Sequence, residues 1–189
     1  RRAAGMKRLL TIQDLSCVGQ CSTTVALPLL SACGVECAVL PPAMLSNHTA
    51  AGFRGWSFCD LTAEMTKVEE KWVGQGIRFD AFYTGYVCEQ HIDPILSIMR
   101  TCAVPGAIRI VDPAMADNGK LYPAFDEKYV EAMKELCFAL DPKNESTHMP
   151  IKTIRRQIRN LYIKLHPNSY IGVFPYDVFI ESWDEGEDY

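Results

Sequence analysis

The chain has 189 residues, of which 48% are hydrophobic and 22% are charged, and its formal net charge is -4. A chain of this length buries about two thirds of its surface on folding, and its composition lies outside the disordered class, so we expect a globular fold. The negative charge excludes a general attraction to nucleic acid, and no apolar run reaches the roughly 20 residues of a membrane span, so we expect a soluble, cytoplasmic protein.

The first third of the chain predicts a strand, a helix and a second strand in succession. A short apolar run over residues 7–13 is typical of a buried strand, and a helix is expected over residues 20–33. A second strand is expected over residues 36–40, followed by a long loop over residues 41–57. This order is typical of a parallel sheet whose strands are joined by helices.

The same alternation continues to about residue 140. A helix that Asp60 caps is expected to run to residue 73, followed by a strand over residues 79–84 and a helix over residues 90–102. A fourth strand is expected over residues 107–111, and a helix over residues 126–140. The expected buried stripes of the first two of these helices are Leu61, Met65, Val68 and Trp72, and Ile92, Ile95, Leu96 and Met99.

This alternation predicts an α/β fold with a parallel sheet, helices on both faces and right-handed crossovers. Ligands of such sheets bind beyond the carboxyl ends of the strands. We therefore expect the binding site in the loops that begin at Asp14, Pro41, Gly85 and Asp112.

The alternation stops after residue 140, which predicts a division of the chain. Residues 1–5 are interpreted as a leader before Met6, residues 6–140 as the main domain, and residues 141–189 as an atypical tail.

Within this tail, residues 151–165 form a basic amphipathic stretch. For this stretch we favour a surface helix over a role at nucleic acid or a membrane surface. Residues 170–180 resemble a strand interrupted by a proline, and residues 184–189 form an acidic end.

The eight cysteines lack the spacing of a metal site. Cys17 and Cys21, like Cys33 and Cys37, are four residues apart, which is a helical spacing and not that of a C-x-x-C motif. We expect reduced thiols packed in apolar segments, while a redox or metal role stays open as the alternative.

Two carboxylates follow the fourth predicted strand. Asp112 ends the strand, and Asp117 follows five residues later in a loop that contains glycine. Such a pair suits a Mg²⁺ ion that carries nucleotide phosphates. Helix capping and turn formation are the alternative roles of these residues, and the spacing alone leaves both interpretations open.

Four strings of residues, in the same order and spacing, resemble the pyridoxal and pyridoxamine kinases of the ribokinase-like superfamily. Residues 112–122 have the pattern D-P-x-M-x-D-x-G-x-x-Y, which is similar to the ATP-side signature of that family. Residues 9–14 resemble its first strand and vitamin-binding loop, residues 45–49 its S-N-H-T loop, and residues 83–86 its T-G-Y string. The resemblance covers residues 6 to about 138.

The resemblance implies a three-layer ribokinase-like fold. It also implies transfer of the γ-phosphate of ATP, with Mg²⁺, to the 5'-hydroxymethyl group of pyridoxal, pyridoxamine or pyridoxine. By the same resemblance, the vitamin pocket is formed by Asp14, Ser16, Thr49 and Tyr86, and the metal and nucleotide site by Asp112 and Asp117. Asp14 departs from those relatives that have serine at this position.

Two residues of these strings have further interpretations. The flat ring of Tyr86 suits a pyridine face, although an ordinary core tyrosine after a strand is the alternative. His48 is expected to form hydrogen bonds in its loop and not to act as a general base.

Two strings of the family do not occur in this sequence. They are P-N-x-x-E and G-T-G-D, whose glycines hold phosphate and whose aspartate is the catalytic base. No G-x-x-x-x-G-K-[ST] loop replaces them. Because phosphoryl transfer depends on positioning and charge stabilisation, we name no catalytic base and expect the activity of this chain to be crippled.

We interpret the chain as the front half of such a kinase, from a truncated or frame-disrupted gene, with an uncovered edge on its fourth strand. The alternatives are a non-catalytic B6-binding or interaction fragment and a hydroxymethylpyrimidine kinase. A homodimer is left open.

Overall fold

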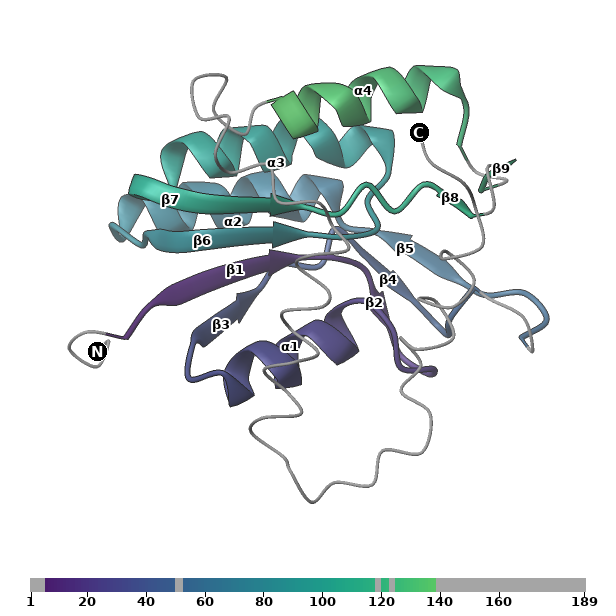
Figure 1. Cartoon of the computed structure of the whole chain (residues 1–189), viewed down its shortest axis with the longest axis horizontal. Coiled ribbons are helices and arrows are strands. Elements are labelled where there is room, and N and C mark those ends of the chain that lie inside the picture. Colours follow the sequence, from purple (N-terminus) through teal and green to yellow (C-terminus); the bar gives the residue numbers. More distant parts are fainter. Residues whose placement is uncertain (1–5, 50–52, 118–119, 123–124, 139–189) are drawn as a thin grey trace, which may run out of the picture. The chain divides into compact units, whose positions relative to one another are not determined.

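The structure is a computed structural model that describes residues 6–49, 53–117, 120–122 and 125–138 (Figure 1). These residues belong to two compact units, one with residues up to Ala114 and from Glu127 onward, and the other with Met115–Asp126. The expected division of the chain at residue 140, and the expected leader and tail segments, lie outside the described residues.

Four parallel strands form the main sheet of the first unit, in the order β3-β1-β6-β7. Their bounds are Glu36–Val39 for β3, Arg8–Ile12 for β1, Phe79–Thr84 for β6 and Ala103–Val111 for β7. In the centre of the sheet, Leu10 of β1 pairs with Ala38 of β3 on one side and with Phe82 of β6 on the other.

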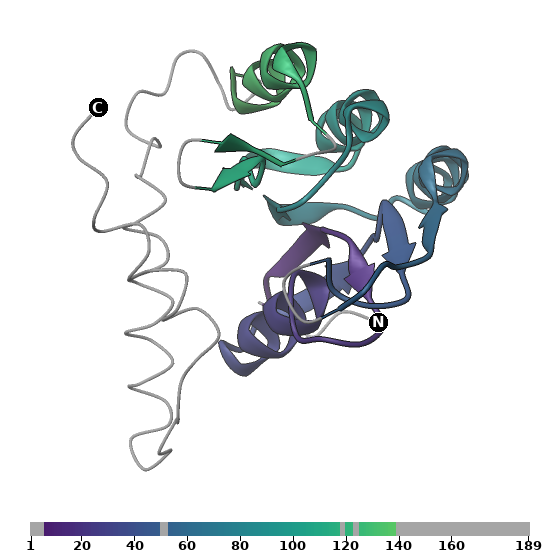
Figure 2. The ribbon, with the colours of Figure 1, turned by 90° about the vertical axis from the view of Figure 1, so that its right-hand side faces the viewer.

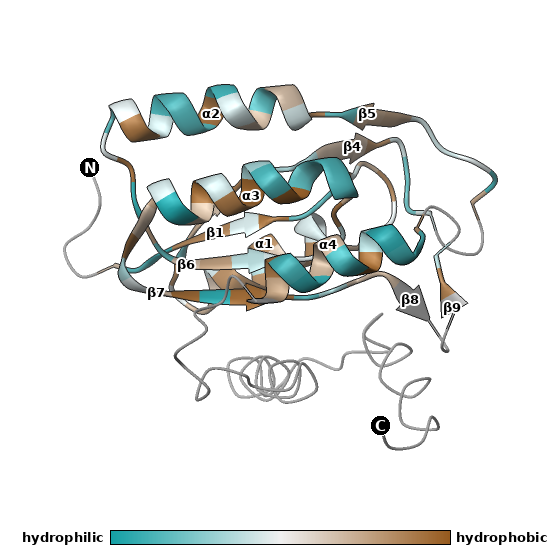
Figure 3. Ribbon diagram, turned by 90° about the horizontal axis from the view of Figure 1, so that it is seen from above, coloured by the Kyte–Doolittle hydropathy of each residue, from teal (hydrophilic) through white to brown (hydrophobic). Residues whose placement is uncertain are grey.

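Helices cover both faces of this sheet. Helix α1 (Thr23–Ala32) lies on one face, and α2 (Thr62–Gly74), α3 (Glu89–Thr101) and α4 (Glu127–Phe138) lie on the other (Figure 2). The last three helices lie side by side and carry many hydrophilic residues on their outer surface (Figure 3). The predicted α/β fold with a parallel sheet covered on both faces is therefore confirmed.

Large side chains between the sheet and α2 and α3 form the core. The ring of Phe79 contacts Trp72 and Phe82 edge to face, with centroid distances of 5.1 and 5.8 Å. Burying such aromatic side chains contributes a large share of the hydrophobic stabilisation. Other fully buried members of the core are Leu10, Ile12, Met65, Ile95 and Ile98.

The structure contains a small second sheet that was not predicted from the sequence. Strand β4 (Ala43–Leu45) lies inside the predicted loop and pairs with β2 (Leu15–Ser16) and with β5 (Phe58–Asp60), in the order β2-β4-β5. The prediction of a continuous loop over residues 41–57 is therefore wrong. Strands of two or three residues are too short to show a period of two in the sequence.

Several predicted bounds shift. Helix α1 begins at Thr23 and not at residue 20, because the preceding Ser22 has a φ of 47°. Asp60 ends β5 and is not the N-cap of α2, although its carboxylate accepts a hydrogen bond from the Thr62 N–H at 2.8 Å. In α3, Ile92, Ile95 and Met99 are buried as predicted, and Ile98 is buried in place of Leu96, which is half-buried.

Strand β7 begins four residues earlier than predicted and contains a proline and a glycine. Gly106 has a φ of 74°, and the pairing register shifts between Phe79 and Ala81 of β6. Such residues normally break a strand, and here they coincide with a bulge. Within the described part of the chain, no strand pairs with the outer edge of β7, where Ile108 is 61% exposed.

The cysteines are less buried than expected. All eight are free thiols, and Cys102 is buried, but Cys17, Cys33 and Cys59 are exposed. The prediction that the thiols are packed in the interior is therefore wrong for these three. Among the described residues, no helix is long and apolar enough to cross a lipid bilayer.

The second unit contains a two-stranded antiparallel sheet, β8 (Ala116–Asp117) and β9 (Lys120–Leu121). The Tyr122 N–H donates to the carbonyl of Met115 at 2.9 Å and closes this hairpin.

Candidate functional site at the strand ends

The carboxyl ends of β1, β6 and β7 are joined by backbone hydrogen bonds. The Gly85 N–H donates to the Ile12 carbonyl, and the Asp112 N–H donates to the Thr84 carbonyl, each at 3.2 Å. The segments that follow these strands therefore begin side by side at one edge of the sheet. This is the edge at which open α/β sheets bind their ligands.

Asp14 is a buried carboxylate at the end of β1, with 5% of the residue exposed. The Ser16 hydroxyl donates to its Oδ2 at 3.2 Å. Burial raises the pKa of Asp14, while hydrogen bonds from Ser22 and Ser16 and the nearby His48 partly offset this shift. Two of the predicted site residues, Asp14 and Ser16, are thus in direct contact.

We expect Asp14→Asn to stabilise the protein without ligand at pH 7.5. The pKa of Asp14 is raised above its ordinary value of 3.8, so the folded state binds the proton more tightly than the unfolded chain does. The ionised carboxylate therefore costs stability that increases as the pH rises through the folded pKa. Thermal unfolding at pH 7.5 and at pH 3 checks this, since the gain should disappear at the lower pH. A lower melting temperature of the variant at pH 7.5 would contradict it.

The loop that contains Thr49 connects β4 with β5 and is anchored to the segment after β2. The His48 N–H donates to the Val18 carbonyl at 2.8 Å. Gly19 has a φ of 92°, and a Cβ added there would lie 2.8 Å from the Cβ of His48, so this close approach requires glycine. Thr49 itself is exposed.

Tyr86 follows β6 and is half-buried. Its side chain is hydrogen-bonded to Cys88, whose pKa is raised mainly by burial and also by the charges of Asp60 and Asp14. The Tyr86 segment therefore lies within electrostatic range of the Asp14 carboxylate. The structure thus brings the segments of Asp14, Ser16 and Tyr86 to one edge of the sheet and anchors the Thr49 loop beside them.

The two predicted metal ligands belong to different units. Asp112 is half-buried at the end of β7, and Asp117 lies in β8 of the second unit. Among the residues that the structure describes, no group of three or more His, Cys, Asp or Glu side chains could hold a metal ion. A Mg²⁺ ion that keeps its waters and nucleotide phosphates needs only one or two carboxylates, so a single aspartate at a strand end fits such an ion.

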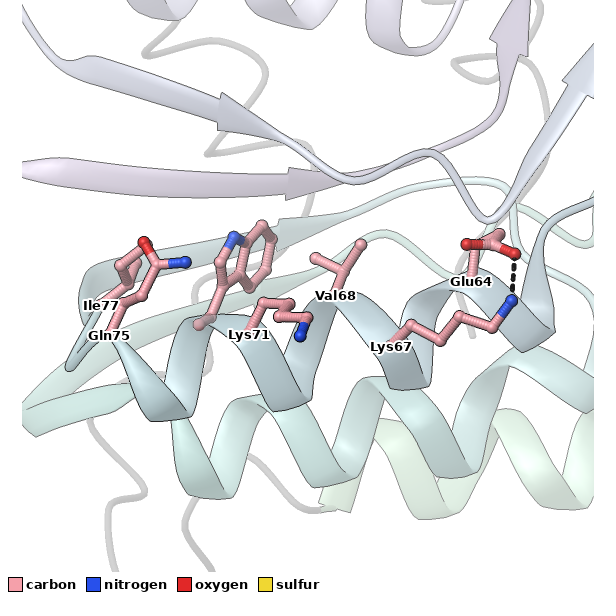
Figure 4. A pocket seen from close by; sticks show the side chains of 7 residues that line it. Glu64, Lys67, Val68, Lys71, Gln75 and Ile77 are labelled. Atoms are coloured by element: carbon pink, nitrogen blue, oxygen red, sulfur yellow. Dashed lines mark hydrogen bonds and ion pairs between the residues drawn. The ribbon is translucent and has the colours of Figure 1, made fainter.

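A shallow hollow of about 350 Å³ lies along α2 (Figure 4). Its lining residues are Glu64, Lys67, Val68, Lys71, Trp72, Gln75 and Ile77. The ion pair of Lys67 with Glu64, at 2.6 Å, lies on this surface. None of the predicted site residues lines the hollow, and an open surface beside an exposed ion pair is a weak candidate for a ligand site.

Four further residues near the strand ends were not assigned to the candidate site from the sequence. Ser22 and His48 act on Asp14, and Asp60 and His91 form a hydrogen bond beside the Tyr86 segment. The left-handed backbone of Ser22 cannot be recognised from its residue type. The partners of His91 could not be inferred because Asp60 is 31 positions away in the sequence.

No known protein-family model and no curated protein matches the chain. Solved structures do match. A protein of Bacteroides thetaiotaomicron assigned as a phosphomethylpyrimidine kinase is 33% identical, with a TM-score of 0.69, and the match covers 84% of this chain and 60% of that protein. A second crystal form of that protein, described as containing pyridoxal, is 34% identical, with a TM-score of 0.65, and the match covers 82% of this chain and 59% of that one.

Two pyridoxal kinases are also similar. That of Lactobacillus plantarum is 32% identical, with a TM-score of 0.63, over 69% of this chain and 46% of that enzyme. That of Leishmania donovani in complex with ADP and pyridoxamine is 24% identical, with a TM-score of 0.56, over 71% and 48%, and shows the shared fold alone. The chain thus spans between 46% and 60% of these proteins. Over the matched residues it shares the ribokinase-like fold of the pyridoxal and phosphomethylpyrimidine kinases.

Proposed function

We propose that the chain binds a B6 vitamer, with pyridoxal as the first candidate, at the carboxyl ends of β1 and β6. The observation that carries this proposal is the buried Asp14 carboxylate, which accepts a hydrogen bond from Ser16 beside the Tyr86 segment. A buried carboxylate is stabilised by further hydrogen-bond donors. The hydroxyl groups of pyridoxal, and its ring nitrogen when protonated, can supply them.

The other residues of the proposed vitamin site are Thr49 and Tyr86. The ring of Tyr86 would cover the pyridine face, and Thr49 would contact the ring from the loop between β4 and β5. The similarity to a structure that contains pyridoxal, at 34% identity, supports this ligand.

We further propose that the reaction is ATP-dependent phosphorylation of the 5'-hydroxymethyl of the vitamer. Asp112 would bind the Mg²⁺ that neutralises the nucleotide phosphates, while a role of Asp117 at the nucleotide rests on the resemblance alone. The family strings that hold phosphate and supply the base are not found in this sequence. We therefore expect the chain to bind the vitamer but to phosphorylate it slowly or not at all. We also propose that the protein is cytoplasmic and that the chain divides into residues 6–140 and residues 141–189.

Titration of the chain with pyridoxal, by absorbance and by calorimetry, tests the binding. Tyr86→Ala should weaken the affinity about five- to tenfold, whereas Tyr86→Phe should keep most of it because an aromatic contact contributes about 0.5–1.5 kcal/mol. Lys67→Ala, on the exposed surface of α2, is the matched control. Absence of saturable pyridoxal binding by the unmodified chain would refute the proposal.

Measurement of ATP consumption separates the alternatives. Turnover with pyridoxal supports a kinase, and binding without turnover supports a non-catalytic B6-binding fragment. Turnover with hydroxymethylpyrimidine but not with pyridoxal would favour the second candidate, a pyrimidine kinase, which the 33% identity to the Bacteroides protein supports.

A further inference from the structure

His91 is a buried histidine that the proposed binding site does not use. It lies in the first turn of α3, five residues after Tyr86, and none of its surface is exposed. A buried imidazole needs partners for both ring nitrogens.

The two ring nitrogens of His91 have opposite roles. Nδ1 accepts the backbone N–H of Cys88 at 2.9 Å, so it carries no proton. Nε2, which then carries the only proton of the ring, donates to Oδ1 of Asp60 at 3.3 Å. The ring is therefore neutral, in agreement with the lowering of its pKa by burial.

Asp60 connects this imidazole to the small sheet. It is the last residue of β5, and its carboxylate also accepts hydrogen bonds from the Thr62 N–H and from the side-chain amide of Gln90. Strand β5 pairs with β4, and the loop with Thr49 joins these two strands. His91 thus connects the segment of Tyr86 with the β4–β5 pair, at the end opposite the Thr49 loop, where Asp60 pairs with Ala43.

The Tyr86 segment is held at two other points. The Gly85 N–H donates to the Ile12 carbonyl of β1, and the Tyr129 hydroxyl of α4 donates to the Val87 carbonyl at 2.6 Å. These two contacts hold the segment to β1 and to α4. The hydrogen bond of the Cys88 amide to His91 leads on, through Asp60, to the small sheet.

We propose that His91 is a positioning residue, which sets the Tyr86 segment and the Thr49 loop at the spacing that the vitamer needs. This inference rests on the proposed function. His91 acts through the Cys88 amide on one side and the Asp60 carboxylate on the other. Loss of either hydrogen bond should weaken pyridoxal binding although the protein stays folded.

Two substitutions separate the two hydrogen bonds. His91→Asn keeps an acceptor near the position of Nδ1 and loses the donor to Asp60, whereas His91→Gln keeps a donor that reaches Asp60 and loses the acceptor for Cys88. His91→Leu removes both. We expect each single loss to weaken the affinity for pyridoxal about three- to tenfold and the double loss to weaken it further.

The partner variant shows whether the pair acts as a unit. Asp60→Ala removes the acceptor, and it should weaken binding more in the unmodified protein than in the His91→Leu background, since the interaction has already been removed there. Additive effects of the two substitutions, or full affinity in all three His91 variants, would overturn the inference. The inference would also be overturned if the lower fraction of folded protein in a variant accounted for all of its loss of apparent affinity.

Amide hydrogen exchange distinguishes a failure of this inference from a failure of the proposed function, because it needs no ligand. The Cys88 amide should lose protection in His91→Gln and keep it in His91→Asn, while the amides of residues 45–48 should lose protection in His91→Asn and His91→Leu. If the unmodified chain binds no pyridoxal, the proposed function fails, and the exchange pattern alone decides the positioning role. Unchanged exchange in these segments would overturn that role.

Discussion

Gly85→Ala is expected to lower the free energy of unfolding by about 1–3 kcal/mol and to remove pyridoxal binding. A Cβ added at position 85 would lie 2.5 Å from Oε1 of Gln13 and 2.8 Å from its Cδ. Gln13 cannot easily move away, because it is 4% exposed and its amide group donates to the Thr11 hydroxyl at 2.9 Å. Relief of the clash must therefore displace the backbone that leads to Tyr86.

Gly74→Ala is the matched control for this prediction. Gly74 is the last residue of α2, and a Cβ added there would meet no atom within 4 Å. Alanine is the better helix former, so this variant should be as stable as the unmodified chain or slightly more stable. Urea unfolding and pyridoxal titration measure both effects, and equal behaviour of the two variants would show that Gln13 yields to the added methyl group.

Phe82→Ala should lower the free energy of unfolding by about 3–5 kcal/mol. The ring is fully buried in β6, in the centre of the sheet, and contacts Phe79 edge to face. Removing it leaves a cavity beside Phe79, whose contact with Trp72 attaches α2 to the sheet. Many domains of this size have only about 5–15 kcal/mol of stability in total, so the loss is a large fraction.

Phe58→Ala is the control on the same residue type. Phe58 lies on β5 and is 44% exposed, so its truncation should cost less than about 1 kcal/mol. Chemical denaturation of both variants measures the difference. A loss for Phe82→Ala as small as that for Phe58→Ala would mean that the ring is not part of the central core.

The main sheet was predictable because its strands are short apolar runs between turn residues. The bounds of β6, Phe79–Thr84, agree with the prediction, and those of β1 and β3 agree within one residue at each end. The small sheet was not predictable, because its strands are two or three residues long and form by pairing with distant segments. Local pattern cannot reveal pairing of this kind.

The candidate site was predictable in part for the same reason. The rule that ligands bind at strand ends selects Asp14, Tyr86 and Asp112, and the backbone hydrogen bonds join their strand ends. The contacts that fix these segments were not predictable. Asp60 was expected to cap a helix, and it does accept the Thr62 N–H, but its bond to His91 depends on how α2 and α3 pack.

The bond from Tyr129 to Val87 has a consequence for biosynthesis. Its donor is 42 residues later in the chain than its acceptor. Domains begin to fold while the ribosome still adds residues, so a nascent chain that has emerged only as far as β7 contains all four strands of the main sheet but lacks this brace. The loop that carries Tyr86 therefore reaches its final conformation only after α4 has left the exit tunnel.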